Sequence, residues 1–188
     1  TEGSTQWSLF VALWATHRLL SGDDERVAAA GQRDLLVAVC ALGATLLARI
    51  DALLIVSAFA AGVLVAGVSH VQAGRWRPST LRVVMTRLVV GLLVFVAWSL
   101  AHGWWLSRPY VTALGDKLAP LAAASVGSLL LALVMVRVQR AQDAIGAALS
   151  ALARVRLPLS VLATGALAAA VWWAWTVRPT LEPFEPFR

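Results

Sequence analysis

The chain has 188 residues, of which 60% are hydrophobic and only 14% are charged, and its mean hydropathy is +0.76. Soluble domains carry roughly a quarter charged residues, so this composition excludes an ordinary soluble domain and predicts an integral membrane protein. The net charge of +6 does not indicate nucleic-acid binding, because the basic residues alternate with apolar segments and form no basic motif. The single cysteine, Cys40, excludes a disulfide framework and a cysteine-based metal site.

Apolar segments recur along the chain and predict an all-α fold, a polytopic bundle of about six transmembrane helices within residues 1–176. The six segments are Trp7–Leu20, Leu35–Ala48, Ala52–Val68, Val83–His102, Leu118–Val136 and Pro158–Thr176. The connections are Ser21–Asp34, Arg49–Asp51, Ser69–Arg82, Gly103–Lys117 and Arg137–Leu157. Residues 177–188 form a proline-rich tail. Because the chain opens without an initiator methionine or signal sequence, we expect further spans upstream.

The charged triplet Arg49-Ile50-Asp51 interrupts a long apolar run from Leu35 to Val68. As one helix this run would be about 50 Å long, whereas the hydrocarbon core of a bilayer is about 30 Å thick. Two short spans that turn at the triplet would place both charges at a membrane surface. Ionisable residues in such a place are functional candidates. The alternative is that Arg49 and Asp51 pair or are solvated in a short turn.

The distribution of basic residues predicts the orientation of the bundle. Eleven basic residues fall on the side of the first connection and five on the other, so the first side should be cytoplasmic and both ends of this chain extracytoplasmic. Tryptophans cluster near both predicted surfaces, as in an aromatic belt: Trp7, Trp104, Trp105, Trp172, Trp173 and Trp175 outside, and Trp76 inside. Alternatively, Trp104 and Trp105, with Pro109, line a pocket for a sugar or an isoprenoid.

A polar stretch near residues 141–153 has apolar residues at helical spacing, Ile145, Leu149 and Leu152. It is too short and polar to span a membrane, which predicts an amphipathic helix on the cytoplasmic surface or a simple connecting helix.

Charged residues gather on the predicted outer face. They are Glu2, Arg49, Asp51, Arg108, Asp116 and Lys117. Arginine and lysine neutralise phosphate, and a carboxylate can orient a hydroxyl, hold a cation or accept a proton. This set therefore suits a phosphate headgroup at a membrane surface. No soluble-enzyme motif is present, and His17, His70 and His102 lie at span ends on different sides, as solvated interfacial histidines do.

Read in order, these segments resemble the C-terminal part of GT-C class membrane glycosyltransferases that use polyprenyl-phosphate sugars. Bacterial arabinofuranosyl-, mannosyl- and aminoarabinose transferases belong to this class. The resemblance rests on Thr1-Glu2-Gly3-Ser4-Thr5 before the first span, and on Leu46-Leu47-Ala48-Arg49-Ile50-Asp51-Ala52-Leu53-Leu54 at the turn. It also rests on Arg75-Trp76-Arg77, and on the segment from His102 to Thr112 with Lys117 following. Ile50 stands where the class usually has proline.

The resemblance implies sugar transfer from a polyprenyl phosphate to a glycan, lipid or protein acceptor on the extracytoplasmic face of a bacterial inner membrane. It implies that Arg49, Arg108 and Lys117 hold the lipid phosphate, while Glu2 and Asp51 act as supporting carboxylates. The main catalytic Asp of the class lies in an earlier loop, so no principal catalytic residue is expected in this chain. A divalent cation would suit the carboxylates, as in some relatives.

Two other classes of function fit the sequence. The first alternative is a non-catalytic scaffold or assembly subunit, whose outward charges contact a protein partner. The second is a transporter for a lipid-linked substrate, although the chain has no internal repeat and few prolines inside its spans. An upstream outward loop with one or two aspartates would favour the enzyme.

Overall fold

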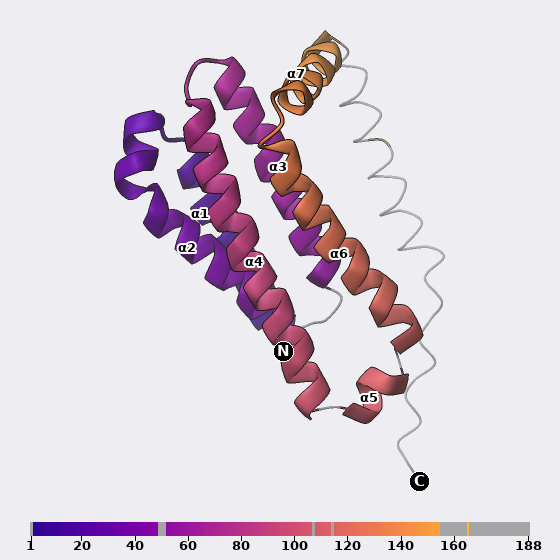
Figure 1. Ribbon diagram of the computed structural model, residues 1–188. Coiled ribbons are helices and arrows are strands. Elements are labelled where there is room, and N and C mark those ends of the chain that lie inside the picture. The colour runs from indigo at the N-terminus through magenta and orange to yellow at the C-terminus, as the bar shows by residue number, and fades with distance from the viewer. Residues whose placement is uncertain (1, 49–51, 107, 114, 155–164, 166–188) are drawn as a thin grey trace. The chain divides into compact units, whose positions relative to one another are not determined.

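The computed structural model describes residues 2–48, 52–106, 108–113, 115–154 and 165, and its regular elements over these residues are all helices. They are α1 (Glu2–Leu20), α2 (Asp24–Ala48), α3 (Ala52–Gln72), α4 (Pro78–Leu106), α5 (Arg108–Ala113), α6 (Gly115–Met135) and α7 (Gln139–Arg154) (Figure 1). Contacts divide the chain into two units, Thr1–Gly146 and Ala147–Arg188. The bundle of α1–α6 and the first half of α7 belong to the first unit.

Four helices are long and apolar enough to cross a membrane, which agrees with the predicted membrane class. The four stretches are Gly31–Ala48, Ala52–Gln72, Pro78–Leu106 and Leu118–Met135. The expected number of about six spans is not confirmed. The first predicted span, Trp7–Leu20, is helical within α1 but is not one of the four. The sixth, Pro158–Thr176, lies outside the described residues apart from Gly165.

The second helix is longer than the apolar pattern predicts. It begins at Asp24 rather than Leu35, so the expected connection Ser21–Asp34 shrinks to a tight turn. The Asp23 carboxylate accepts a hydrogen bond of 3.1 Å from the backbone N–H of Arg26 and caps the new first turn. Arg18 of α1 pairs with Asp34 at 3.6 Å, which holds the polar part of α2 against α1.

The connection between α3 and α4 is also shorter than predicted. Instead of Ser69–Arg82, only the residues between Gln72 and Pro78 lie outside the helices. Gly74 has a φ of 69°, which favours glycine, and the N–H of Arg75 reaches back to the His70 carbonyl at 2.9 Å. The N–H of Gly74 bonds to the Val71 carbonyl at 3.1 Å, and together these bonds form a Schellman C-cap.

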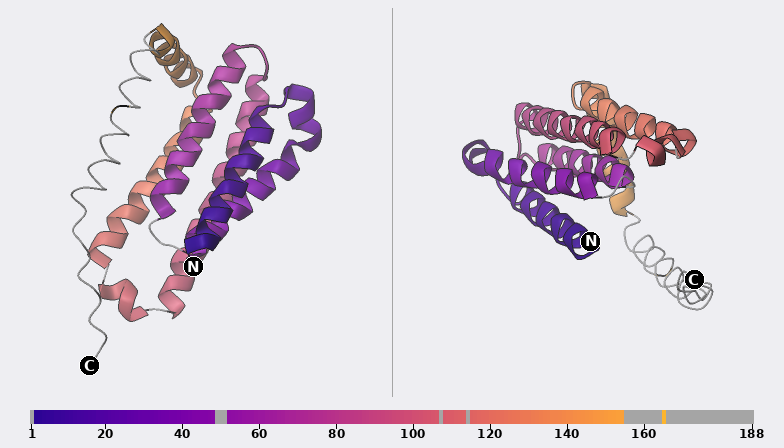
Figure 2. Two further views of the ribbon diagram at one scale, coloured as in Figure 1. Left: turned by 180° about the vertical axis from the view of Figure 1, so that it is seen from behind. Right: turned by 90° about the horizontal axis from the view of Figure 1, so that it is seen from below.

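The first unit is an antiparallel bundle with α1 at one edge (Figures 1 and 2). Helix α1 packs on α2, α2 packs on α4, and α3 contacts both α4 and α6. Lipid supplies no hydrophobic force between helices, so close approach at small residues matters. The Phe95 ring of α4 lies directly over Gly43 of α2, where a Cβ atom would collide with it. Leu81 occupies the corresponding space at Gly67 of α3.

The unit has two chemically different ends. We call the end that holds the α1–α2 turn, the α3–α4 turn and the end of α6 the arginine-rich end. Its arginines are Arg18, Arg26, Arg33, Arg75, Arg77, Arg82, Arg87, Arg137 and Arg140. The opposite end, the α5 end, holds the start of α1, the end of α2, the start of α3 and the α4–α5–α6 corner (Figure 1). This separation follows the sequence-based division of connections.

Helix α7 covers the predicted helix at 141–153 and is tied to α6 at its start. The side chain of Gln142 is almost fully buried and donates a hydrogen bond of 2.6 Å to the carbonyl of Val136. Ile145 packs against the core of the bundle. In the second unit, Leu152 is exposed. The location of α7 on a membrane surface stays a prediction.

Candidate functional site at the α5 end

Two buried serines hold the junction between α2 and α3 from both sides. The Ser99 hydroxyl of α4 donates a hydrogen bond of 3.0 Å to the carbonyl of Leu46, in the last turn of α2. The Ser125 hydroxyl of α6 donates one of 2.9 Å to the carbonyl of Leu53, in the first turn of α3. The carbonyls in the last turn of a helix lack partners within that helix, so Ser99 satisfies one of them. The end of α2 is therefore tied to α4, and the start of α3 is tied to α6.

The α4–α5–α6 corner extends beyond this junction. Helix α4 continues from Ser99 to Leu106, a further distance of about 10 Å. Helix α6 likewise begins at Gly115, ten residues before Ser125. The short helix α5 joins the two, and Asp116 is exposed in the first turn of α6. The corner is thus a projecting element next to these helix ends.

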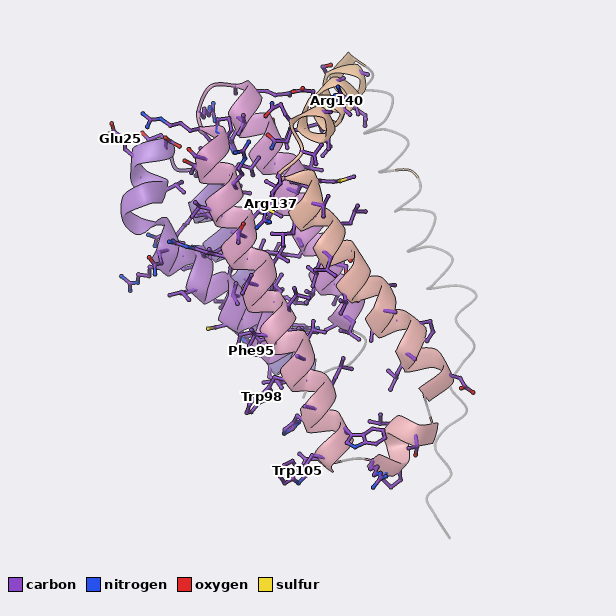
Figure 3. All side chains as sticks on the ribbon, in the orientation of Figure 1. Glu25, Phe95, Trp98, Trp105, Arg137 and Arg140 are labelled. Atoms are coloured by element: carbon purple, nitrogen blue, oxygen red, sulfur yellow. The ribbon has the colours of Figure 1, made fainter. Side chains whose placement is uncertain are left out.

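Aromatic residues dominate the projecting part of α4. The guanidinium carbon of Arg108 lies 5.3 Å from the centre of the Trp104 ring, within the range of a cation–π interaction. Trp105 instead lines a cavity of about 450 Å³ with Trp98 and His102, and Figure 3 shows Trp98 and Trp105 along the outer side of α4. The walls of this cavity are almost wholly apolar. Its lining residues all lie on one exposed face of α4, so it is an open apolar hollow on the surface of a single helix.

The structure places only part of the predicted site. Arg49 and Asp51 lie outside the described residues, as do the side chains of Glu2 and Lys117, whose backbones belong to α1 and α6. Arg108 is exposed and lies over Trp104. Trp105 lines the apolar cavity, whereas Trp104 and Pro109 do not. Of the described segments, the start of α1, the end of α2, the start of α3 and the α4–α5–α6 corner lie at the same end of the bundle, and α5 contacts α4 and α6 (Figure 1).

Sequence reasoning did not identify Ser99, Ser125 or Trp98 as parts of this end. A single serine inside an apolar span is a signal for an interhelical hydrogen bond, because such a hydroxyl needs a partner in the membrane. Ser57 is also a single serine inside an apolar span, but its hydroxyl donates a hydrogen bond within its own helix, to the Leu53 carbonyl at 3.1 Å. The sequence pattern alone therefore cannot separate the bridging serines from the local ones.

The part of the chain that the structure describes contains no group of three or more His, Cys, Asp or Glu side chains that could hold a metal ion. The predicted carboxylates Glu2 and Asp51 are outside that search. A divalent cation at the α5 end therefore stays an expectation from the resemblance.

A second polar cluster lies at the arginine-rich end. The Asp24 carboxylate accepts hydrogen bonds from the Thr80 hydroxyl and, at 3.0 Å, from the backbone N–H of Arg77. The Arg77 side chain also pairs with this carboxylate at 3.2 Å. The bond from Thr80, then that from Arg77, holds the pKa of Asp24 below its ordinary value. Asp24 of α2 thus caps the start of α4, and the role of this cluster is to hold the two helices together.

Comparison with protein families, with curated proteins and with solved structures finds no match for this chain.

Proposed function

We propose that this chain is the C-terminal part of a membrane glycosyltransferase that takes a sugar from a polyprenyl phosphate. Transfer to a glycan, lipid or protein acceptor would take place on the extracytoplasmic face of a bacterial inner membrane. The observation that supports the proposal is that three parts of the chain lie at the same end of the bundle. These parts are the start of α1, the helix ends of α2 and α3 that flank residues 49–51, and the α4–α5–α6 corner (Figure 1). They are the segments whose residues resemble the GT-C class.

The chemistry at this end suits a lipid-linked donor. Arg49 and Lys117, with Arg108, would neutralise the donor phosphate, because arginine forms two parallel hydrogen bonds to phosphate oxygens. The apolar cavity beside Trp105 would accept isoprenoid groups. Glu2 and Asp51 would orient sugar hydroxyls or hold a cation. The bond from the sugar to the phosphate breaks as the acceptor oxygen attacks, and the polyprenyl phosphate leaves.

The arrangement of the two ends supports this orientation. Nine arginines of the described chain lie at the arginine-rich end. Cytoplasmic connections carry an excess of basic residues, so the α5 end would face outward. A donor phosphate in the outer leaflet would then lie at the level of the α2–α3 junction.

Donor binding by the full-length protein tests the proposal. Purified in mild detergent, the wild-type protein should retain a polyprenyl phosphate that native mass spectrometry detects. Arg49→Ala and Lys117→Ala should each weaken this binding by about ten-fold or more, because a hydrogen bond to a charged group contributes roughly 1.5–3 kcal/mol. Arg33→Ala, at the opposite end of the bundle, is the matched control and should bind as wild type.

Unchanged donor binding in both variants would reject the proposed roles of Arg49 and Lys117. A protein that purifies without polyprenyl phosphate, but with a stoichiometric protein partner, would instead support a scaffold subunit. Proteoliposomes that move a lipid-linked sugar across the bilayer without transferring it would support the transporter.

A further inference from the structure

A hollow on the surface of the arginine-rich end gathers three cations. The cavity has a volume of about 370 Å³ and is lined by Arg82, Val83, Thr86, Arg87 and Arg137. Four of these residues lie on one face of α4, and Arg137 lies two residues beyond the end of α6, where Figure 3 labels it. Two helices that are distant in sequence therefore build one basic surface.

Three of the arginines that lack an acidic partner line this one cavity. Arg18 pairs with Asp34 at 3.6 Å, and Arg77 pairs with Asp24 at 3.2 Å. Within the residues that the structure describes, Arg82, Arg87 and Arg137 are all exposed and form no ion pair. Three positive charges line this cavity without an ion-pair partner among the described residues, so an anion there would be favoured.

The depth of Arg87 along α4 points to a ligand within the membrane interface. From Arg87 to Trp104 the helix rises about 25 Å, and the residues between them carry no Asp, Glu, Lys or Arg. This length is close to the thickness of the hydrocarbon core. Arg87 therefore lies where the hydrocarbon meets the lipid headgroups, at the depth of lipid phosphates.

The surface beside the cavity is suited to acyl chains. Val90 and Val94 continue the same face of α4 towards the opposite end and are 50% and 61% exposed. On α6, Leu131 and Val134 precede Arg137 and are 54% and 56% exposed. A molecule with its anionic group between the arginines would thus have apolar protein surface along its chains.

We propose that Arg82, Arg87 and Arg137 bind the phosphate-bearing headgroup of an anionic phospholipid in the leaflet at the arginine-rich end. Each guanidinium can form two parallel hydrogen bonds to phosphate oxygens, and Thr86 adds a hydroxyl. The bound lipid bridges α4 to the end of α6. This site is separate from the α5 end and does not depend on the proposed glycosyltransferase activity.

The test titrates the full-length protein, in neutral detergent, with short-chain phosphatidylglycerol and follows thermal unfolding by tryptophan fluorescence. Separate arms use short-chain phosphatidylcholine and inorganic phosphate. Phosphatidylglycerol should raise the Tm of the wild-type protein saturably, and phosphatidylcholine should not. The variant R82Q/R87Q/R137Q should need at least about ten-fold more phosphatidylglycerol for the same rise in Tm. Each substitution removes hydrogen bonds from a charged group to the phosphate.

The matched control is R26Q/R33Q/R75Q, which removes the same number of exposed arginines from the same end but outside the cavity. It should respond to phosphatidylglycerol as wild type. Equal weakening in both variants would overturn the site, because it would reflect general attraction to a basic surface. Stabilisation by inorganic phosphate as strong as that by phosphatidylglycerol would overturn the assignment to a lipid.

Single substitutions keep the test decisive if the triple variant fails to fold. Arg137→Gln should weaken the response to phosphatidylglycerol, and Arg137→Lys should weaken it less, because lysine keeps the charge but not the paired hydrogen bonds. An unchanged response in Arg137→Gln and in Arg87→Gln would reject the proposal.

Discussion

The indole Nε1 of Trp76 donates a hydrogen bond of 2.9 Å to the carbonyl oxygen of Gly22, joining the turn after α3 to the turn after α1. Only 2% of Trp76 is exposed, and its ring stacks on that of His70 with centroids 5.3 Å apart. The sequence suggests that Trp76 belongs to an aromatic belt at the membrane surface. The structure instead buries it as the link between two turns of the arginine-rich end.

Replacing Trp76 by phenylalanine should destabilise the protein. A smaller aromatic ring remains, and the buried carbonyl of Gly22 loses its donor, which alone costs about 1–3 kcal/mol. Chemical unfolding in mild detergent measures this loss. Trp105→Phe is the control, because Trp105 is 87% exposed and its replacement should change stability by less than about 0.5 kcal/mol. Equal losses in the two variants would contradict a structural role of the hydrogen bond.

The Asp24 cluster should make stability depend on acid pH. The hydrogen bonds from Thr80 and Arg77 depress the pKa of Asp24 below its ordinary value of 3.8. A carboxyl with a depressed pKa in the folded state stabilises the fold above its ordinary pKa, and this contribution is lost as pH falls through the folded pKa. The difference in Tm between wild type and Asp24→Asn should therefore be constant near neutral pH and shrink in acid.

Thr80→Val provides a sharper version of the acid test. Without the Thr80 hydroxyl, the pKa of Asp24 in the folded state should rise towards its ordinary value, so this carboxyl should stabilise the fold less near neutral pH and the loss of stability in acid should be smaller than in wild type. Thermal unfolding followed from about pH 6 to about pH 3 measures this loss. An acid limb that coincides with that of wild type would show that the Thr80 bond does not influence this carboxyl.

The close packing of α2 on α4 depends on the glycine beneath Phe95. A methyl group at Gly43 would collide with the Phe95 ring, so Gly43→Ala should destabilise by about 1–3 kcal/mol. Combining it with Phe95→Leu should recover part of this loss, which a double-mutant cycle measures. Gly127→Ala is the control, because a Cβ there meets open space. Additive effects of the Gly43 and Phe95 substitutions would contradict the predicted contact.

The serines that anchor the α2–α3 junction should contribute modestly to stability. Interhelical hydrogen bonds in membrane proteins average about 0.6 kcal/mol, so Ser99→Ala and Ser125→Ala should each cost on this order. Ser128→Ala is the control, because the Ser128 hydroxyl bonds within its own helix, to the Ser125 carbonyl at 2.9 Å. If the junction binds the donor, the two bridging variants should also weaken donor binding, and the control should not.

Much of the helical architecture could be predicted from the sequence, because long apolar runs in a membrane protein favour helices. The limits of α2 could not be predicted from apolarity, since Asp24–Asp34 is polar and its helix is fixed by contacts with α1. The Asp23 cap was nevertheless visible as an acidic residue before a helical stretch. A search for helix caps would have placed the start of α2 correctly.

The candidate site could be predicted only as a set of segments. Successive connections in a helical bundle lie at alternate ends, so every second connection lies at the same end. The sequence therefore predicts that Arg49 and Arg108 share an end. It does not predict that Arg108 lies over Trp104, or that Trp105 faces a separate cavity. These arrangements depend on the rotation of α4 and on the path of α5, which are set by packing between helices.

The unequal lengths of α3 and α4 shape the access to the α5 end. With 29 residues α4 is about 43 Å long, whereas α3 with 21 residues is about 31 Å long, close to the thickness of the hydrocarbon core. The surface at this end is therefore stepped: the start of α3 forms the lower level, and the corner of α4 and α5 forms the upper one. If the α5 end binds a lipid-linked donor, as proposed, a lipid diffusing within the leaflet would reach the lower level from the side without leaving the bilayer.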